Sequence, residues 1–178
     1  MKKNLIDEIK SISITARVAF GLICLEKCIK NEKLFLNNTF LWLLNEMWSY
    51  TNTSDAASWQ EEMDEACPEV IFDERAVYEE FEKITPQMGY ELRSLYDEIP
   101  AYITRIVDEV ILIGTSNLYA GTGEYAKNSH FHTMNVIQIM EDKNIPLPSI
   151  EIFREYSFKE KGGWGRGFDK EEIVSKLK

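Results

Sequence analysis

Cysteine is scarce in this sequence, with three in 178 residues. Cys24 and Cys28 lie one helical turn apart inside an apolar run, and Cys67 stands alone before Pro68. A chain of this length buries roughly two-thirds of its unfolded surface, so it folds without covalent crosslinks. The cysteines therefore fit small core residues in a reducing compartment and argue against a disulfide framework.

Long apolar runs are missing as well. The longest dense run spans residues 18–25, between Arg17 and Glu26, and falls well short of the roughly 20 residues that a bilayer-spanning helix needs. The first residues, MKKNLIDEIKSISI, place acids and serines where a signal peptide has an uninterrupted apolar region. We therefore expect a cytoplasmic protein with no membrane partner.

The alternation of apolar and polar residues that marks half-buried strands is also rare. Apolar residues recur instead at three- and four-residue steps along almost the whole chain. No repeat, low-complexity tract or long linker divides the sequence. We predict an all-α fold over residues 1–178, a single-domain irregular bundle of about seven or eight helices with a Gly- and Trp-rich C-terminal loop.

Residues that favour the first turn of a helix mark several expected helix starts. A central helix is expected from residue 14, and another from about residue 129 to 143. We also expect a helix from Asp73 through ERAVYEEFEKI, with Val77, Phe81 and Ile84 on one face. The expected N-terminal residues are Ser13, Asn38, Ser54 or Asp55, Thr85 with Pro86, and Pro100.

Basic residues are outnumbered, 20 against 30 acids, which gives a net charge of -10. This balance disfavours nucleic acid and anionic lipid as partners. Ten of the acids but one base, Arg75, fall within residues 61–82, a local net charge of -9. Trp59, Phe72, Tyr78 and Phe81 are interleaved with these acids. The combination suits a basic protein surface, because charge raises the encounter rate and desolvated aromatic side chains slow dissociation.

The stretch KEKGGWGRGFDKEE, residues 159–172, holds four of the nine glycines. GGWGRG lacks the Gly-Lys-Ser/Thr ending of a phosphate-binding loop, and the residues before it make a poor buried strand. Two interpretations stay open. The glycines allow positive φ angles while Trp164 covers the end of the bundle, or Trp164 and Arg166 project from the loop as binding anchors.

The segment GTSNLYAGTGEYAKNSHFH, residues 114–132, mixes glycines with small hydroxyl side chains and tyrosines. It fits helix packing and capping, or a small-molecule pocket around Asn117, Tyr119, Tyr125 and His130. His130 and His132 lie two positions apart, so on a helix they point about 200° apart. We therefore expect no shared metal ion.

No nucleophile elbow or other catalytic motif is present. The acids Glu61, Glu62, Asp64 and Glu65 favour a solvated helix face over the carboxylate pair of a metal or glycoside site. The residues thus name no catalytic group, cofactor or metal, and they favour a binding protein over an enzyme.

Three segments, SITARVAFGLICLEKCI (13–29), ILIGTSNLYAG (111–121) and GGWGRGF (162–168), cover 35 of the 178 residues. They resemble, in that order, segments of small, mostly α-helical immunity proteins from bacterial polymorphic toxin systems. Members of that family are encoded beside a secreted toxin and are thought to neutralise it by direct binding inside the producing cell. The resemblance implies a cognate toxin domain as the partner.

The leading hypothesis is therefore an immunity protein that binds a toxin domain with a basic surface. Two alternatives remain: an enzyme or small-molecule-binding protein with its pocket in residues 114–132, and a helical adaptor or oligomerisation module. The residues assigned to partner binding, chosen from the charge distribution and the loop, are Trp59, Glu61, Glu62, Asp64, Glu65, Glu69, Asp73, Glu74, Tyr78, Trp164 and Arg166.

Overall fold

The computed structural model describes residues 2–177, with side chains from residue 4 onward, and the described chain is helical with no strand. The all-α fold is confirmed. Within these residues, seven helices have ten residues or more, and none is both long and apolar enough to cross a membrane. The elements are α1 (Lys2–Ser11), α2 (Ile14–Asn31), α3 (Asn38–Ser49), η1 (Tyr50–Asn52), α4 (Ala56–Ala66), α5 (Pro68–Ile71), η2 (Tyr78–Glu80), α6 (Pro86–Glu98), α7 (Ala101–Thr115), α8 (Lys127–Asp142), η3 (Ile150–Phe153), η4 (Glu160–Gly163) and α9 (Lys170–Val174).

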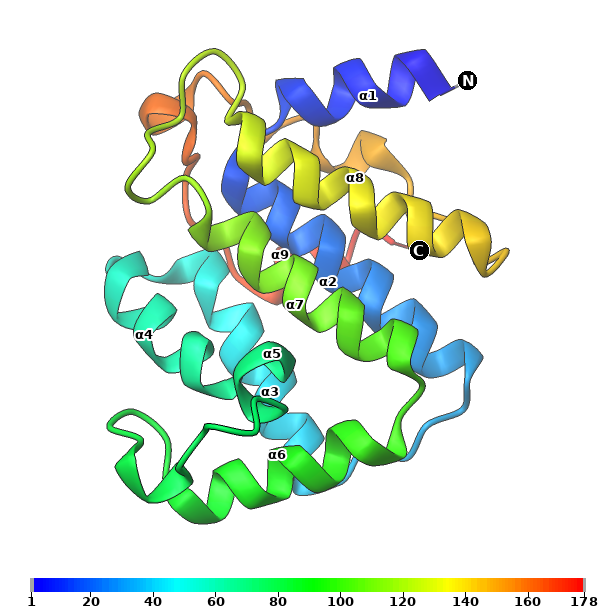
Figure 1. Ribbon diagram of the computed structural model, residues 1–178. Coiled ribbons are helices and arrows are strands. Elements are labelled where there is room, and N and C mark those ends of the chain that lie inside the picture. The colour runs from blue at the N-terminus through cyan, green and yellow to red at the C-terminus, as the bar shows by residue number, and fades with distance from the viewer. Residues whose placement is uncertain (1, 178) are drawn as a thin grey trace.

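Helix α2 is the centre of the bundle, as expected. It packs against α7 and α8, which run beside it across the molecule (Figure 1), and 14 of its 18 residues are buried. A helix buried on nearly all sides is apolar all round, which explains the dense run that begins at Val18. Gly21 lets α2 approach α7 closely, because a Cβ there would lie 2.8 Å from Val110 Cγ2.

The helix starts follow the expected capping chemistry. Ser13, Asp55 and Thr85 accept backbone N–H groups in the first turns of α2, α4 and α6, at 3.0 to 3.2 Å. The cap of α3 is Asn37 rather than Asn38, with its side chain accepting the amide of Phe40 at 2.8 Å. Two adjacent asparagines are chemically equivalent as caps, so the sequence alone did not separate them.

The prediction of a helix from Asp73 to Ile84 is wrong. Only the single 3-10 turn η2 forms there, and the rest of the segment is irregular. Its amides find other partners: the Glu65 carboxylate accepts the N–H groups of Glu82, Lys83 and Ile84, at 2.8 to 2.9 Å. Like charges one turn apart also destabilise a helix in so acidic a segment.

The C-terminal segment returns to the start of α2. Ser13 N–H donates to the carbonyl of Tyr156, and Phe158 N–H donates to the carbonyl of Ser11, both at 2.8 Å. Both hydrogen bonds flank the isolated bridge between Ile12 and Ser157. These contacts hold the Gly-rich loop against the buried helix.

Candidate functional site

The acidic segment, residues 61–82, covers the second half of α4 together with α5 and η2. It lies at the end of the molecule away from α1 (Figure 1). In α4, Trp59, Met63 and Ala66 face the core, which turns the intervening carboxylates outward. All seven predicted carboxylates are exposed or half-buried. We call five of them the acidic surface, leaving out Glu65 and Asp73: Glu61, Glu62, Asp64, Glu69 and Glu74.

Two carboxylates of the acidic surface are held in an unfavourable electrostatic environment. The pKa of Glu62 is raised, mainly by burial and then by the nearby Glu46 and Glu65. The pKa of Asp64 is raised by burial, partly offset by a hydrogen bond from Gln60. A cation placed against this surface would favour the ionised carboxylates, since an opposite charge lowers a carboxyl pKa.

Glu65 and Asp73, also assigned to partner binding, serve the fold. Glu65 is half-buried, and its two oxygens accept the three amides of residues 82–84. Asp73 accepts two hydrogen bonds from the guanidinium of Arg75, which with the backbone amide lowers its pKa to about 2. The carboxylates of both residues are thus engaged within the chain.

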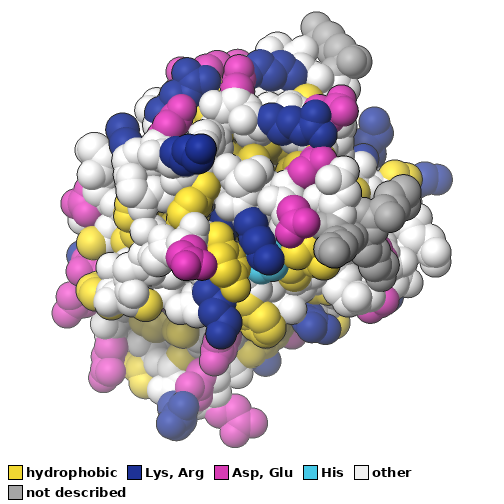
Figure 2. Space-filling model, turned by 90° about the horizontal axis from the view of Figure 1, so that it is seen from above, with side chains coloured by type: hydrophobic (Ala, Val, Ile, Leu, Met, Phe, Trp, Pro, Cys, Tyr) yellow, Lys and Arg dark blue, Asp and Glu magenta, His cyan; other side chains and the backbone are white. Residues whose placement is uncertain are grey.

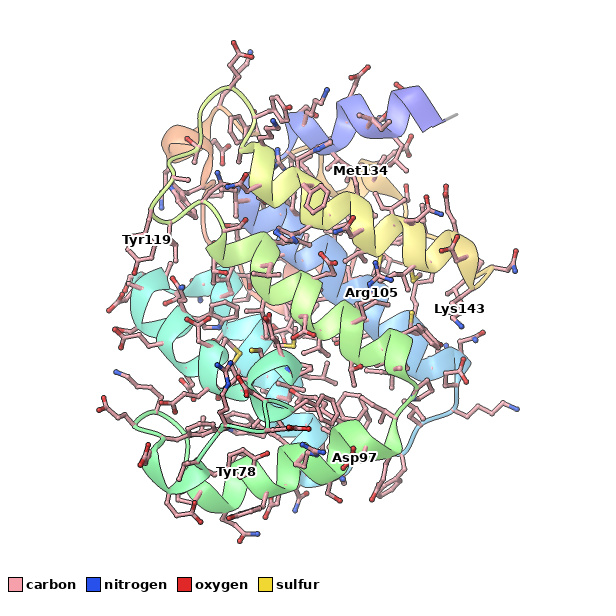
Figure 3. All side chains as sticks on the ribbon, in the orientation of Figure 1. Tyr78, Asp97, Arg105, Tyr119, Met134 and Lys143 are labelled. Atoms are coloured by element: carbon pink, nitrogen blue, oxygen red, sulfur yellow. The ribbon has the colours of Figure 1, made fainter. Side chains whose placement is uncertain are left out.

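The predicted aromatic anchors in and just before the acidic segment lie in the core. Trp59 is 5% exposed, and its indole N–H donates to the carbonyl of Glu46 at 2.7 Å. Tyr78 lies beside α6 (Figure 3), buried, with its hydroxyl donating to the carbonyl of Ile71. We therefore correct the predicted surface by leaving out Trp59 and Tyr78. Trp59 and Tyr78 stand among acids in the sequence because buried and exposed positions alternate along a helix or turn.

The Gly-rich loop caps the start of α2. The amide and hydroxyl of Thr15 both donate to the carbonyl of Trp164, at 3.2 and 2.7 Å. Gly165 has a φ of +84°, and a Cβ there would lie 2.3 Å from Ser13 Oγ. Trp164 is half-buried against the core, so the loop has the structural role that the glycines suggested. Arg166 is exposed, with its guanidinium 4.8 Å from the ring centre of Tyr156.

A hollow of about 340 Å³ lies between this loop and the start of α4. Of the residues predicted to bind a partner, Trp164 lines it, together with Ser54 and Ala56, which precede the predicted acidic residues in the chain. Hydroxyl side chains make up much of the rest of its wall. Its other lining residues include Thr15, Thr51, Thr53 and Lys161.

The segment of residues 114–132 is mainly occupied with its own packing. Asn117 is buried: its amide donates to the carbonyl of Gly121, and its oxygen accepts the N–H of Ser129 in α8. Tyr119 is 87% exposed and lies at the outer edge of the loop (Figure 3). Asn117 thus serves as a capping group, the structural alternative considered for this segment.

The hollow in this segment holds about 230 Å³, below the 300 to 1,000 Å³ usual for small-molecule pockets. Asn117 and Tyr125 line it, whereas Tyr119 and His130 are not among its lining residues. His130 packs edge-on against Tyr125, with ring centres 5.5 Å apart. Burial, followed by the charges of Arg17 and Lys10, lowers its pKa.

Arg17 is a structural residue that the sequence analysis used only as the boundary of an apolar run. Its side chain is fully buried and lies 5.4 Å from the ring centre of Phe158. The guanidinium donates to four backbone carbonyls, and burial lowers its pKa to about 10. These carbonyls belong to Ile9, Lys10, Tyr125 and Ala126.

A second buried polar cluster joins α7 to α8. Glu109 lies 2.8 Å from Nδ1 of His132 and accepts the side-chain amide of Asn135 at 3.0 and 3.1 Å. Glu109 and His132 lie 23 residues apart, and no sequence motif links residues at that spacing. Their contact follows only from the packing of α7 against α8.

One face away from the acidic surface is mixed in charge (Figure 2). On the face around α1 and the loop after α7, basic and acidic side chains lie side by side (Figure 2).

Within residues 2–177, no group of three or more His, Cys, Asp or Glu side chains is arranged to hold a metal ion. In comparisons with known proteins, no family model, curated protein or solved structure matches this chain.

Proposed function

We propose that this protein is an immunity protein that binds the basic surface of a cognate toxin domain and neutralises it. The observation that carries the proposal is the concentration of charge, ten acids against one base in residues 61–82. Keeping a protein soluble does not require single-sign clustering, since solubility follows net charge. A clustered surface of one sign steers an oppositely charged partner and fixes its orientation.

The electrostatics of the acidic surface support this proposal. Glu62 and Asp64 have raised pKa values because they are partly buried, and Glu62 also lies near other carboxylates. Lys83 pairs with Glu61 and supplies one compensating cation. A partner's Lys or Arg side chains would relieve the remaining repulsion between the carboxylates, and this attraction would make the binding free energy more favourable.

Trp164 extends the proposed contact beyond the carboxylates. It lines the 340 Å³ hollow that Ser54 and Ala56 border at the start of α4. Tryptophan beside a pocket is a common hot spot, because a large ring buries much apolar area on binding. In the proposed complex, the hollow accepts a side chain of the toxin while the acidic surface covers its basic face.

Neutralisation would follow from occupancy of the toxin's basic face. A cationic groove built for nucleic acid is one such face, and the carboxylates of the acidic surface would occupy the positions where phosphates bind. The expected partner is thus a toxin domain with clustered Lys and Arg residues.

The test begins by identifying the partner. The tagged protein is used to capture proteins from its own host at low salt, and the captured proteins are identified by mass spectrometry. We expect a dominant partner encoded beside this protein, whose basic domain arrests growth when expressed alone. Co-expression of this protein should restore growth. A captured partner that is harmless to cells contradicts the proposal.

The second step tests the surface. The triple variant Glu61→Lys, Glu62→Lys, Asp64→Lys should weaken binding at least about a hundredfold, because it places like charges against each other. Glu65 is left intact, since it holds residues 82–84. The matched control reverses three exposed acids elsewhere: Glu98→Lys, Glu124→Lys and Asp142→Lys. Equal affinity of the two triple variants, with unchanged helical circular dichroism, excludes the acidic surface.

A further inference from the structure

An apolar groove lies at the turn between α2 and α3, remote in sequence from the acidic segment. It encloses about 350 Å³. Five aliphatic side chains line it together with Glu26, Lys30, Asn45 and Lys170. We call it the elbow groove after the turn that forms it. The aliphatic side chains that line it are Ile29, Leu34, Leu36, Leu41 and Leu44.

Large apolar side chains are exposed around this groove. Phe35 is 85% exposed, Leu41 43% and Leu36 37%, all within seven residues. Each costs free energy in water, at roughly 25 cal/mol for every Å² of apolar surface left uncovered. A single exposed apolar residue is ordinary, but a cluster edged by polar groups marks an interaction surface.

The turn that presents these side chains is fixed by backbone hydrogen bonds. Leu34 N–H donates to the carbonyl of Ile29 at 3.1 Å, and Lys33 takes the left-handed conformation with a φ of 55°. Asn37 then caps α3 through the amide of Phe40. The groove is therefore preformed, which lowers the entropic cost of binding.

Charges of both signs lie at the groove, with lysines in excess. Lys30, Lys170 and Glu26 line it, and Lys33 is exposed on the turn beside Glu32. Lys170 lies 2.6 Å from Glu26, and in the described part of the chain Lys30 and Lys33 have no ion-pair partner. In a protein of net charge -10, these two lysines can pair with the carboxylates of a partner.

A second hollow of about 530 Å³ adjoins the elbow groove and shares Asn45 and Lys170 with it. The two hollows follow α3 and η1 from Leu41 to Asn52, about 16 Å at 1.5 Å per residue. The second hollow is polar, with Asn45, Asn52, Thr53 and the carboxylates of Asp169 and Glu171 in its wall, so the partner's carboxylates are placed at the elbow groove and not here. Together they offer an apolar end for anchors and a polar continuation for a peptide backbone or polar side chains.

We propose that the elbow groove docks an amphipathic helical segment of a partner protein, with bulky apolar side chains on one face and carboxylates beside them. The apolar side chains enter the groove between Leu36, Leu41 and Leu44, and the carboxylates pair with Lys30 and Lys33. This is the helix-in-groove mode of recognition, with charge complementarity fixing the orientation. The inference does not rest on the toxin-binding function, because no residue of the acidic surface takes part.

The experiment uses the whole protein and three synthetic helical peptides of about four turns. The first peptide carries Leu and Phe on one face and Glu beside them; the second has Lys in place of Glu; the third has Ser in place of Leu and Phe. Binding is measured by fluorescence anisotropy and mapped by amide and methyl NMR. We expect the first peptide alone to bind, with shifts confined to residues 29–45, 49–53 and 170.

Four protein variants complete the experiment. Leu41→Ser and the double variant Lys30→Glu, Lys33→Glu should each weaken binding of the first peptide at least about tenfold. Leu177→Ser removes a comparably exposed apolar side chain, 42% exposed, and should leave binding unchanged. The acidic-surface triple variant should also bind the peptide normally, which separates this inference from the toxin-binding proposal.

Several outcomes overturn the inference. One is a lysine peptide that binds as tightly as the glutamate peptide, and another is a set of NMR shifts that lies elsewhere. No binding of the first peptide at millimolar concentration excludes such a partner. Self-association that Leu41→Ser abolishes assigns the groove to a second copy of this chain. Binding of anionic vesicles that depends on Phe35 and Leu41 assigns it to a membrane surface.

Discussion

Glu65 acts inside the fold although it lies in the most acidic part of the chain. Its carboxylate accepts the amides of Glu82, Lys83 and Ile84, at 2.8 to 2.9 Å. We predict that Glu65→Ala lowers the free energy of unfolding by roughly 2 kcal/mol or more, since hydrogen bonds to a charged group are the strong ones. Urea denaturation measures this loss. Asp64→Ala is the control and should cost much less, because the Asp64 carboxylate accepts the side-chain amide of Gln60 and no backbone amide among the described residues.

Asp108 on α7 gives the protein a pH-dependent stability. Burial raises its pKa to about 7, offset in part by a hydrogen bond from the amide of Glu69, and Glu69 and Glu109 add repulsion. The folded pKa therefore exceeds the ordinary value of 3.8, so the folded state binds more protons than the unfolded state between about pH 4 and pH 7. Stability should fall as the pH rises through that window.

The variant Asp108→Asn tests whether stability falls as the pH rises through this window. It keeps an oxygen for the amide of Glu69 but cannot ionise, so it should match the natural protein near pH 4 and exceed it at pH 8. The expected gain at pH 8 is roughly 2 to 4 kcal/mol, about 1.4 kcal/mol for each unit of pKa shift. Thermal unfolding over this pH range measures it, with Asp142→Asn as an exposed control. A constant difference across the pH range contradicts the prediction.

At the scale of single residues, the sequence predicts the local interaction that a side chain makes better than it predicts where in the fold the side chain lies. Ser13, Asp55 and Thr85 cap helices as expected, because capping depends on residues within one turn. The burial of Trp59 and the hydrogen bonds of Arg17 depend on segments far away in the chain. No local pattern encodes those contacts, so the sequence alone places Trp59 on a surface and gives Arg17 no role.

At the scale of elements, the Gly-rich loop and the start of α2 form one unit. Gly165 sits over Ser13, with a φ of +84° and no room for a Cβ, which would lie 2.3 Å from Ser13 Oγ. Gly165→Ala should therefore displace the loop from the start of α2. We expect a loss of at least about 2 kcal/mol in stability, because left-handed strain adds to a steric clash.

Gly162→Ala is the matched control for Gly165→Ala. Gly162 also has a positive φ, +63°, but no atom lies within 4 Å of the position of its Cβ. It should cost only the backbone strain, roughly 1 kcal/mol. Chemical denaturation compares the two variants, and equal losses would show that the contact with Ser13 contributes nothing.

The elements themselves follow from the sequence where apolar periodicity and capping agree. Residues 14–31 and 127–142 form helices close to the expected limits. Residues 73–84 have helical periodicity at Val77 and Phe81 but form a single turn, because the carboxylate of Glu65 captures the amides at the end of the segment. A tertiary hydrogen-bond acceptor thus overrides a local pattern.

At the scale of the whole molecule, charge was the most informative property of the sequence. The net charge of -9 in residues 61–82 can be counted without a structure. The structure adds that Trp164 lies near the start of α4, and that Lys30 at the elbow groove and Lys33 on its turn have no ion-pair partner among the described residues. The molecule therefore has an acidic surface and an apolar groove edged by lysines, and each predicts a different partner chemistry.

The proposed binding of a toxin domain by the acidic surface predicts how association depends on salt. If the acidic surface steers association, the association rate should fall steeply as salt rises, since a Debye length of about 8 Å at physiological ionic strength screens exposed charges. The dissociation rate should change little, because close contacts govern it. Stopped-flow measurement of the intrinsic tryptophan fluorescence gives both rates over a salt series.

Two variants assign this salt dependence to a surface. The triple variant Glu61→Lys, Glu62→Lys, Asp64→Lys should associate slowly at every salt concentration, with a flattened or reversed dependence. Leu41→Ser, in the elbow groove, should keep the natural salt dependence, because it removes no charge. The triple variant has a net charge of -4, because each acid-to-lysine change adds two charges to the natural value of -10. If it keeps the steep dependence, steering arises from charges elsewhere on the protein, and the carboxylates of α4 are not the docking site.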